Sequence, residues 1–159
     1  MLFIKRIHKE QWETYRNIRL AALQEAPYAF TTTYASAVAR TPASWRAQAE
    51  AFSDGTDQCL LIAYVDHVAI ALCAFYRDNT HSHVGEIVEV WVASDYRGTS
   101  VAKDLIDAMI QWACSTNTTL IRLDVKKENR RAIGFYQNYG FTVIGENTES
   151  EYIMVLTIQ

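Results

Sequence analysis

The sequence predicts a single α/β domain built around one mixed β-sheet. Apolar runs typical of strands alternate with segments that carry apolar residues at helical spacing, in the order β-α-α-β-β-β-α-β-α-β-β. The strands expected at residues 84–93 and 120–125 are separated by a helix and should lie parallel after a right-handed crossover, whereas hairpins make other neighbours antiparallel. Because no repeat, linker or low-complexity stretch interrupts the 159 residues, we expect one domain over residues 1–159.

The first segment joins a strand to a long helix. Residues 2–7 alternate and fit a strand, and residues 8–26 fit a helix that Pro27 ends. The residues at helical spacing in this helix are Trp12, Tyr15, Ile18, Arg19, Ala22 and Leu23. A second helix is predicted to begin at Pro42, because proline is favourable at the first helical position and Thr41 suits the N-cap before it.

The rest of the chain alternates strands with two more helices. The runs that fit strands are residues 58–65, 68–77, 84–93, 120–125, 141–145 and 152–158. Asp66 and His67 join the first two as a short hairpin, although the usual glycine is absent. An amphipathic helix follows Gly98, with an apolar stripe made of Ala102, Leu105, Ile106, Met109, Ile110 and Ala113. A short helix over residues 129–138 is expected to close at Gly140 as its C-terminal cap.

The charge balance and the apolar pattern exclude several classes of partner. Fifteen basic and eighteen acidic residues give a net charge of −3, without the basic excess that nucleic-acid binding normally requires. The N-terminal segment becomes charged at Lys5, which leaves no room for a signal peptide, and no apolar run approaches membrane-spanning length. We therefore expect a cytoplasmic protein with neither nucleic acid nor a membrane as partner.

The cysteines and histidines do not indicate a metal site. Cys59, Cys73 and Cys114 are an odd number, widely spaced and embedded in apolar sequence, so they are expected to be buried, reduced thiols. His81 and His83 stand in a polar stretch without a further cluster of ligands nearby. No metal is therefore expected.

The most informative segment, residues 90–103, joins the end of a strand directly to the start of a helix. Free backbone N–H groups at a helix N-terminus, with the positive end of the helix dipole behind them, form a site for phosphate or pyrophosphate. The small residues Gly98, Ser100 and Ala102 would let a ligand approach the backbone closely. On this chemistry alone, such a turn serves packing or capping as readily as ligand binding.

A second segment, residues 129–141, lies one strand downstream and completes a larger pattern. It contains Asn129, Ala132, Tyr136 and Gly140-Phe141, and the earlier turn contains Arg97, Ser100 and Ala102. At these spacings the two segments together resemble the signatures of the GCN5-related N-acetyltransferase (GNAT) family. The order of elements agrees with that family, so the resemblance covers essentially the whole chain. The family usually has glycine where Ser100 stands.

The resemblance implies that acetyl-CoA binds as co-substrate in an opening between two parallel strands that splay apart, at residues 86–93 and 120–126. The pantetheine arm is expected to contact Val90, Trp91 and Val92. The pyrophosphate is expected to lie against Gly98, Thr99, Ser100, Val101, Ala102 and Lys103, with Arg97 at the start of the turn. Asn129 is expected to bind the cofactor arm or to hold its loop.

The resemblance also implies direct attack of a neutral amine on the thioester, which requires a general base and a general acid. Tyr136 matches the proton donor of the family, because a phenol is protonated at neutral pH. Glu86 coincides with the base of histone-type members, and Glu89 with an acidic substrate-binding position of polyamine-type members. Asp124 is a third candidate carboxylate. In a regular strand at most one of Glu86 and Glu89 faces the cleft, unless a bulge intervenes.

The acceptor is expected to be a primary amine of a small molecule or peptide, entering between residues 25–34 and the closing hairpin. Aromatic walls there would come from Tyr28, Phe30, Tyr34 and Trp45, although most such residues belong to cores. Carboxylates beside aromatic walls favour a cationic amine.

Two alternatives stay open at this stage. A non-catalytic acetyl-CoA sensor or a partner-binding module could use the same fold, and the serine at position 100 favours it weakly. The closing strand at residues 152–158 could also pair between subunits in a homodimer.

Overall fold

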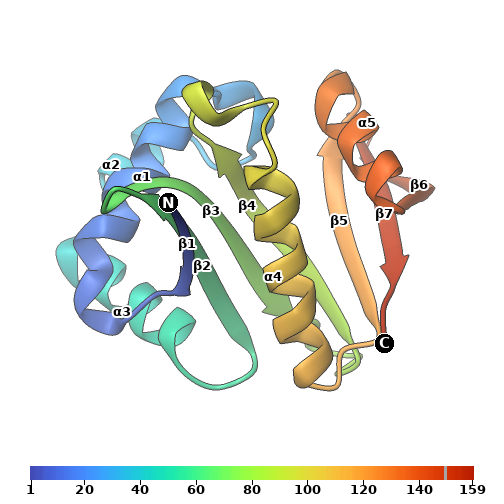
Figure 1. Ribbon diagram of the computed structural model, residues 1–159, viewed down its shortest axis with the longest axis horizontal. Helices are drawn as coiled ribbons and strands as arrows, with labels where there is room; N and C mark the ends of the chain where they lie inside the picture. Colours follow the sequence, from blue (N-terminus) through green and yellow to red (C-terminus); the bar gives the residue numbers. More distant parts are fainter. Residues whose placement is uncertain (149) are drawn as a thin grey trace.

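The computed structural model describes residues 1–148 and 150–159 and confirms the mixed α/β fold (Figure 1). The strands are β1 (Leu2–Arg6), β2 (Gln58–Val65), β3 (Val68–Arg77), β4 (Val84–Val92), β5 (Leu120–Lys126), β6 (Thr142–Thr148) and β7 (Glu151–Thr157). The helices are α1 (Trp12–Glu25), α2 (Tyr34–Val38), α3 (Pro42–Ser53), α4 (Val101–Ser115) and α5 (Arg130–Tyr139). Single turns of 3₁₀ helix are η1 (Lys9–Gln11), η2 (Pro27–Ala29) and η3 (Ser94–Tyr96).

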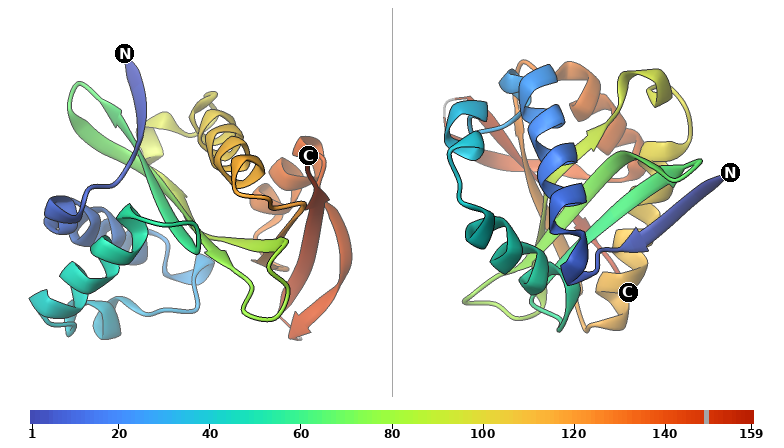
Figure 2. Two further views of the ribbon diagram at one scale, coloured as in Figure 1. Left: turned by 90° about the horizontal axis from the view of Figure 1, so that it is seen from below. Right: turned by 90° about the vertical axis from the view of Figure 1, so that its left-hand side faces the viewer.

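Within the described residues, the strands form one seven-stranded sheet in the order β1-β2-β3-β4-β5-β7-β6. The pair β4 and β5 is parallel, and the other neighbours are antiparallel. Helices α1, α2 and α3 cover one face, and α4 and α5 cover the other (Figure 2). Each face therefore buries its own apolar cluster, one around Trp45 and Phe52 and the other around Leu105 and Met109.

Local sequence explains how several elements begin and end. Thr41 caps α3, with its hydroxyl oxygen accepting a hydrogen bond of 3.1 Å from the backbone N–H of Ser44. Asp66 and His67 take positive φ angles of 50° and 66°, the conformation that a two-residue hairpin requires, so the hairpin forms without glycine. Gly140 ends α5 with a φ of 126°.

The structure departs from the expected elements in several places. The helix expected over residues 8–26 is shorter, because residues 9–11 form the 3₁₀ turn η1 and α1 spans only Trp12–Glu25. The chain forms the short helix α2 where the sequence indicated only a break, because the Thr33 hydroxyl caps it by accepting from the Ser36 N–H at 3.1 Å. Strand β6 continues to Thr148, beyond the end expected at residue 145, because it stays paired with β7 through two irregularities in register.

The sheet opens between β4 and β5. These strands pair only at Val84 with Leu120, Gly85 with Ile121 and Glu86 with Arg122. Beyond this point β5 remains paired with β7 up to Lys126, while β4 stays with β3, and the two parallel strands diverge (Figure 1). The edge of β4 that faces β5 therefore has free backbone groups over its C-terminal half.

A bulge in the same half of β4 changes the direction of one side chain. Ala74 opposes Val88 and Leu72 opposes Trp91, so two β4 residues face one residue of β3 between these pairs. Glu89 lies in this bulge with a φ of 57°. The extra residue turns Glu89 toward α1, the same side of the sheet as Glu86, and both predicted carboxylates thus share one face.

Candidate functional site

A cavity of about 370 Å³ lies where β4 and β5 separate, bounded by η2, the turn before α4 and the start of α5. Its lining includes these sequence-predicted residues: Val90, Trp91, Val92, Arg97, Gly98, Thr99, Ala102, Asn129 and Tyr136. Ser100, Val101 and Lys103 do not contribute to the lining, and Lys103 pairs instead with Asp107 at 2.8 Å. The two segments that the sequence singled out therefore meet in one cleft, which we call the β4–β5 cleft.

The turn that enters α4 is shaped by Gly98. Its φ of +77° lies in the left-handed region that side chains disfavour, and a Cβ there would meet nothing closer than 3.9 Å, so backbone conformation rather than space favours glycine. Ser100 has right-handed helical angles, with φ −77° and ψ −2°. The serine therefore causes no backbone strain where the family has glycine. Its hydroxyl donates to an Asp104 carboxylate oxygen at 3.2 Å.

Replacing Ser100 with glycine is expected to change the affinity for acetyl-CoA by less than about threefold, because the Ser100 hydroxyl is engaged with Asp104 and the backbone is already helical. Calorimetric titration of both proteins with acetyl-CoA checks this. A loss of affinity larger than tenfold would mean that the hydroxyl itself binds the ligand.

Arg97 anchors this turn to two neighbouring elements. Its Nε donates to the Val92 carbonyl oxygen at 3.0 Å, and its Nη2 makes an ion pair with Glu25 at the end of α1. Both partners of that ion pair are about one-third exposed, so solvent weakens it. The arginine that the sequence assigned to the cofactor turn is thus paired with the carboxylate of Glu25, which directly precedes Ala26 of the cleft lining.

Replacing Glu25 with glutamine is expected to tighten acetyl-CoA binding by about two- to fivefold, because it removes a carboxylate that would compete with the phosphates of the expected cofactor for Arg97. The gain should shrink as salt concentration rises, because exposed charges are screened. Titrations at low and high salt test both statements, and weaker binding by the variant would contradict them.

Tyr136 lies in the cleft but is almost enclosed. Its exposure is 8%, and its ring packs edge-to-face against Phe135 and Phe141 at centroid distances of 5.3 and 5.5 Å. Burial raises the pKa of the Tyr136 phenol above its ordinary value, with a further contribution from Cys73. The hydroxyl is therefore protonated at neutral pH, as a proton donor to a thiolate must be.

Asn129 caps the helix that carries Tyr136. Its side-chain oxygen accepts from the Ala132 N–H at 3.3 Å, which fixes the start of α5 against the cleft. Asn129 therefore lines the cleft and also caps the helix on which Tyr136 lies.

Glu89 is held by two residues of α1 that the sequence did not assign to the site. Tyr15 donates its hydroxyl to a Glu89 carboxylate oxygen at 2.9 Å, and Arg19 Nε lies 3.2 Å from the same oxygen. The Glu89 side chain is 13% exposed and that of Arg19 is 8% exposed. The one signal in the sequence was the position of Arg19 on the buried stripe of α1, beside Ile18 and Leu23.

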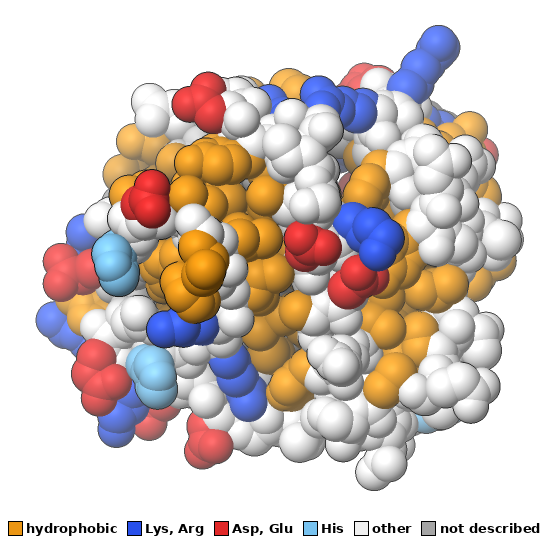
Figure 3. Space-filling view, viewed as in Figure 1, with side chains coloured by type: hydrophobic (Ala, Val, Ile, Leu, Met, Phe, Trp, Pro, Cys, Tyr) orange, Lys and Arg blue, Asp and Glu red, His pale blue; other side chains and the backbone are white. Residues whose placement is uncertain are grey.

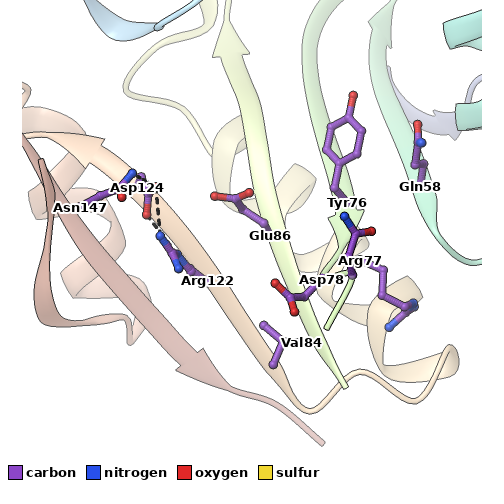
Figure 4. A pocket seen from close by; sticks show the side chains of 10 residues that line it. Gln58, Tyr76, Arg77, Asp78, Val84, Glu86, Arg122, Asp124 and Asn147 are labelled. Atoms are coloured by element: carbon purple, nitrogen blue, oxygen red, sulfur yellow. Dashed lines mark hydrogen bonds and ion pairs between the residues drawn. The ribbon is translucent and has the colours of Figure 1, made fainter. Parts of the chain in front are cut away.

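Glu86 faces a second cavity, of about 590 Å³, shown in Figure 4. Asp124 lies across it on β5, where Arg122 Nε approaches one of its oxygens at 3.2 Å and Asn147 donates to the other at 2.8 Å. Burial raises the pKa of Glu86 above its ordinary value, and the nearby Asp124 charge adds to the shift. Glu86 therefore takes up a proton more readily than an exposed glutamate.

A third cavity, of about 400 Å³, contains Glu89 and Arg19 and lies between the other two along β4. Tyr76 lines both this cavity and the Glu86 cavity. Gln48 holds the Tyr76 hydroxyl by donating to it at 3.2 Å. The sequence had not predicted either Tyr76 or Gln48 as site residues, because nothing in a strand or helix pattern distinguishes them from ordinary half-buried residues.

The aromatic residues expected to surround an acceptor do not lie in one cavity. Tyr28 and Phe30 line the β4–β5 cleft, and Trp45 lines the Arg19 cavity while being 1% exposed. Tyr34 is exposed and lines neither of these cavities. The expected single aromatic wall is thus divided between two cavities.

Other kinds of site are not found within residues 1–148 and 150–159. No cluster of three or more His, Cys, Asp and Glu residues there is arranged to hold a metal ion. No helix in this part of the chain has the length and apolarity needed to cross a bilayer. On the face seen in Figure 3, acidic and basic side chains are interspersed and form no continuous basic stripe.

The cysteines are poorly placed for nucleophilic chemistry. All three are free, Cys59 and Cys73 are buried, and Cys114 is half-buried. Burial raises the pKa of Cys59 to about 11, so little thiolate exists at neutral pH. None of the described residues that line the β4–β5 cleft is a cysteine.

Comparison with known proteins identifies relatives of this chain. A model of the acetyltransferase (GNAT) family matches residues 4–141. An uncharacterized N-acetyltransferase of Methanocaldococcus jannaschii is 33% identical over 69 residues, which are 43% of this chain and 30% of that protein. The match thus spans less than a third of the length of that curated relative.

Solved structures share the fold at low identity. A GNAT-family acetyltransferase from Streptococcus pneumoniae superposes with a TM-score of 0.86 and 16% identity, covering 100% of both chains. The PaiA N-acetyltransferase of Thermoplasma acidophilum, solved with coenzyme A, gives a TM-score of 0.73 and 16% identity over 99% of both chains. The ribosomal-protein-S18-alanine N-acetyltransferase of Escherichia coli gives 0.71 and 14% identity, covering 100% of this chain and 95% of that one.

Proposed function

Because this chain belongs to the acetyltransferase (GNAT) family, we propose that it is an acetyl-CoA-dependent N-acetyltransferase whose acceptor is a primary amine of a small molecule or peptide. The observation that carries the proposal is the β4–β5 cleft, which brings the Arg97–Gly98 turn together with Asn129 and Tyr136. A structural neighbour solved with coenzyme A supports the same ligand class.

Acetyl-CoA would bind with its two ends at different parts of the cleft. The pantetheine amides would pair with the backbone of residues 90–92, where β4 has lost its partner β5. The pyrophosphate would lie against the N–H groups of Gly98 and Thr99 and the N-terminus of α4, whose dipole favours an anion. Arg97, released from Glu25, would add a positive charge beside it.

The bond-making step would be direct attack by a neutral amine on the thioester carbonyl. Glu86 would take a proton from the incoming ammonium through water, since its raised pKa suits a general base. The carbon–sulfur bond then breaks, and the Tyr136 hydroxyl would give its proton to the departing thiolate. The nitrogen loses a second proton once the carbon–nitrogen bond has formed, and this proton would return through water to the Tyr136 oxygen, while Glu86 would release its proton to solvent. The products are an acetamide, coenzyme A and one proton, so protons and charges balance.

Glu86 is the least engaged of the three candidate carboxylates for the base. The Glu89 oxygen that Arg19 approaches also accepts from Tyr15, and Asp124 is paired with Arg122 and Asn147. No cation of the described chain lies within ion-pair distance of Glu86. Glu86 therefore keeps free lone pairs toward its cavity.

A non-catalytic acetyl-CoA sensor on the same fold is the second candidate. The sequence favoured a sensor only because serine replaces the usual glycine at position 100. Ser100 has helical backbone angles that do not require glycine, so the serine gives no conformational reason to expect a loss of catalysis. Thiol release from acetyl-CoA with polyamines, amino acids, aminoglycosides and short peptides distinguishes the two. Binding with turnover of one class supports the transferase, whereas binding with no acetyl-CoA consumption in the whole panel supports the sensor.

A further inference from the structure

We infer that the cavity around Arg19 binds a carboxylate group of the acceptor, so that the preferred substrate is a small amine that also carries a carboxylate. This inference rests on the proposed acetyl transfer and narrows its substrate class. The cavity has a volume of about 400 Å³, within the range of small-molecule sites, and its charged lining residues are Arg19, Arg40 and Glu89.

The charge balance of this cavity favours an anion. Its two arginines face a single carboxylate among the described lining residues, and Arg19 already pairs with that carboxylate at 3.2 Å. One positive charge therefore remains uncompensated. A polyamine would meet the Arg40 guanidinium and a Glu89 carboxylate that is already neutralised, so a cationic acceptor is disfavoured despite the match of Glu89 to an acidic substrate-binding position.

Arg19 itself has unused hydrogen-bonding capacity. A guanidinium has five N–H donors, and the Nη1 atom of Arg19 is buried without a partner among the described residues. Buried polar groups are normally paired, so an orphaned donor needs an explanation. Phe30 covers the guanidinium, whose carbon lies 4.7 Å from the centroid of the ring. A small adjustment on binding would let a carboxylate oxygen pair with this group.

Arg40 is fixed in advance on the other side of the cavity. Its guanidinium carbon lies 3.9 Å from the centroid of the Trp45 ring, and Ser44 accepts hydrogen bonds from its Nε at 2.9 Å and its Nη2 at 3.2 Å. A stacked and hydrogen-bonded arginine loses little conformational freedom when it binds an anion. This preorganised cation therefore provides electrostatic attraction for a carboxylate.

The position of the cavity agrees with binding of the acceptor. Glu89 lines it and is followed directly by Val90, which lines the β4–β5 cleft. A carboxylate held by Arg19 and Arg40 would leave the amine of a small molecule in the cavity beside Glu89, next to the β4 residues proposed to pair with the pantetheine arm. Tyr76 connects this cavity to the Glu86 cavity, from which the proposed base acts.

The test compares matched acceptors that differ only in the carboxylate. Glycine, alanine, serine and glutamate are each assayed against the corresponding α-amide by thiol release at saturating acetyl-CoA, with spermidine as a cationic acceptor. We expect the best amino acid to exceed its amide in kcat/KM by about tenfold or more, the effect of a charged hydrogen bond. The α-amino group of an amino acid amide is less basic than that of the amino acid, so a larger fraction of it is neutral and reactive. This difference favours the amide, and a preference for the amino acid would therefore not be explained by amine basicity.

Arg40→Gln is expected to raise KM for the amino acid and to reduce its preference over the amide by about tenfold. Arg46→Gln is the matched control, because Arg46 lies on the same helix as Trp45, packs over Trp12 at 4.6 Å and does not line the cavity. The control should keep the wild-type preference.

Calorimetry of alanine and alaninamide against the protein saturated with coenzyme A gives a second readout that needs no turnover. Tighter binding of alanine, weakened in Arg40→Gln alone, would support the inference. Equal or better use of amides or spermidine, or no binding of any amino acid to the coenzyme A complex, would overturn it while acetyl transfer stands. Failure of acetyl-CoA itself to bind would overturn the proposed function as well.

Discussion

Replacing Tyr136 with phenylalanine is expected to lower kcat by about 10- to 1000-fold while the dissociation constant of acetyl-CoA changes little. The reason is that the variant removes only the hydroxyl that would protonate the departing thiolate. The ring keeps its packing against Phe135 and Phe141, so the cleft retains its shape. Single-turnover kinetics together with calorimetric titration separate the two quantities.

Tyr139→Phe provides the control for this prediction. Tyr139 is on the same helix, but its hydroxyl donates to Asp107 on α4 and it does not line the cleft. We expect kcat near that of the wild type for this variant. If Tyr136→Phe also turns over at the wild-type rate, Tyr136 has no part in the chemistry.

Replacing Glu86 with glutamine is expected to reduce kcat/KM by about 100-fold or more, the usual contribution of a general base. The wild-type profile should also fall on its acid side, because the reaction needs ionised Glu86. Burial and the Asp124 charge raise the pKa of Glu86, so protonation removes activity at a higher pH than for an exposed glutamate. The variant should lose this acid limb.

Asp124→Asn tests whether the limb belongs to Glu86. Removing the Asp124 charge lowers the pKa of Glu86, so the limb should move to lower pH while activity persists. The base would be another carboxylate if the acid side of the pH profile were unchanged in Glu86→Gln. The same conclusion would follow if Asp124→Asn alone abolished activity.

Much of the fold follows from local sequence because the relevant interactions are local. Thr41-Pro42 defines the start of α3 through a cap, and the stripe containing Leu105 and Met109 defines the buried face of α4. The crossover from β4 through α4 to β5 fixes a parallel pair, and the structure confirms it. The short helix α2 was missed because five residues are too few to show a helical period.

Only part of the candidate site could be predicted from the sequence. The residues of the cofactor turn and of the α5 segment were identified through the family resemblance, and the structure places most of them in one cleft. The orientation of Glu89 was left open because it depends on a bulge that changes the side-chain alternation of β4. The partners Arg19 and Glu25 come from α1, far from Glu89 and Arg97 in sequence, so only tertiary packing reveals these ion pairs.

Isothermal titration of the purified chain with acetyl-CoA tests the central claim most directly, since every proposed step depends on binding in the β4–β5 cleft. We predict saturable binding of one acetyl-CoA molecule per chain, with displacement by coenzyme A. The absence of binding at millimolar acetyl-CoA, above the usual range of substrate affinities, would contradict the proposed function and leave only the family fold.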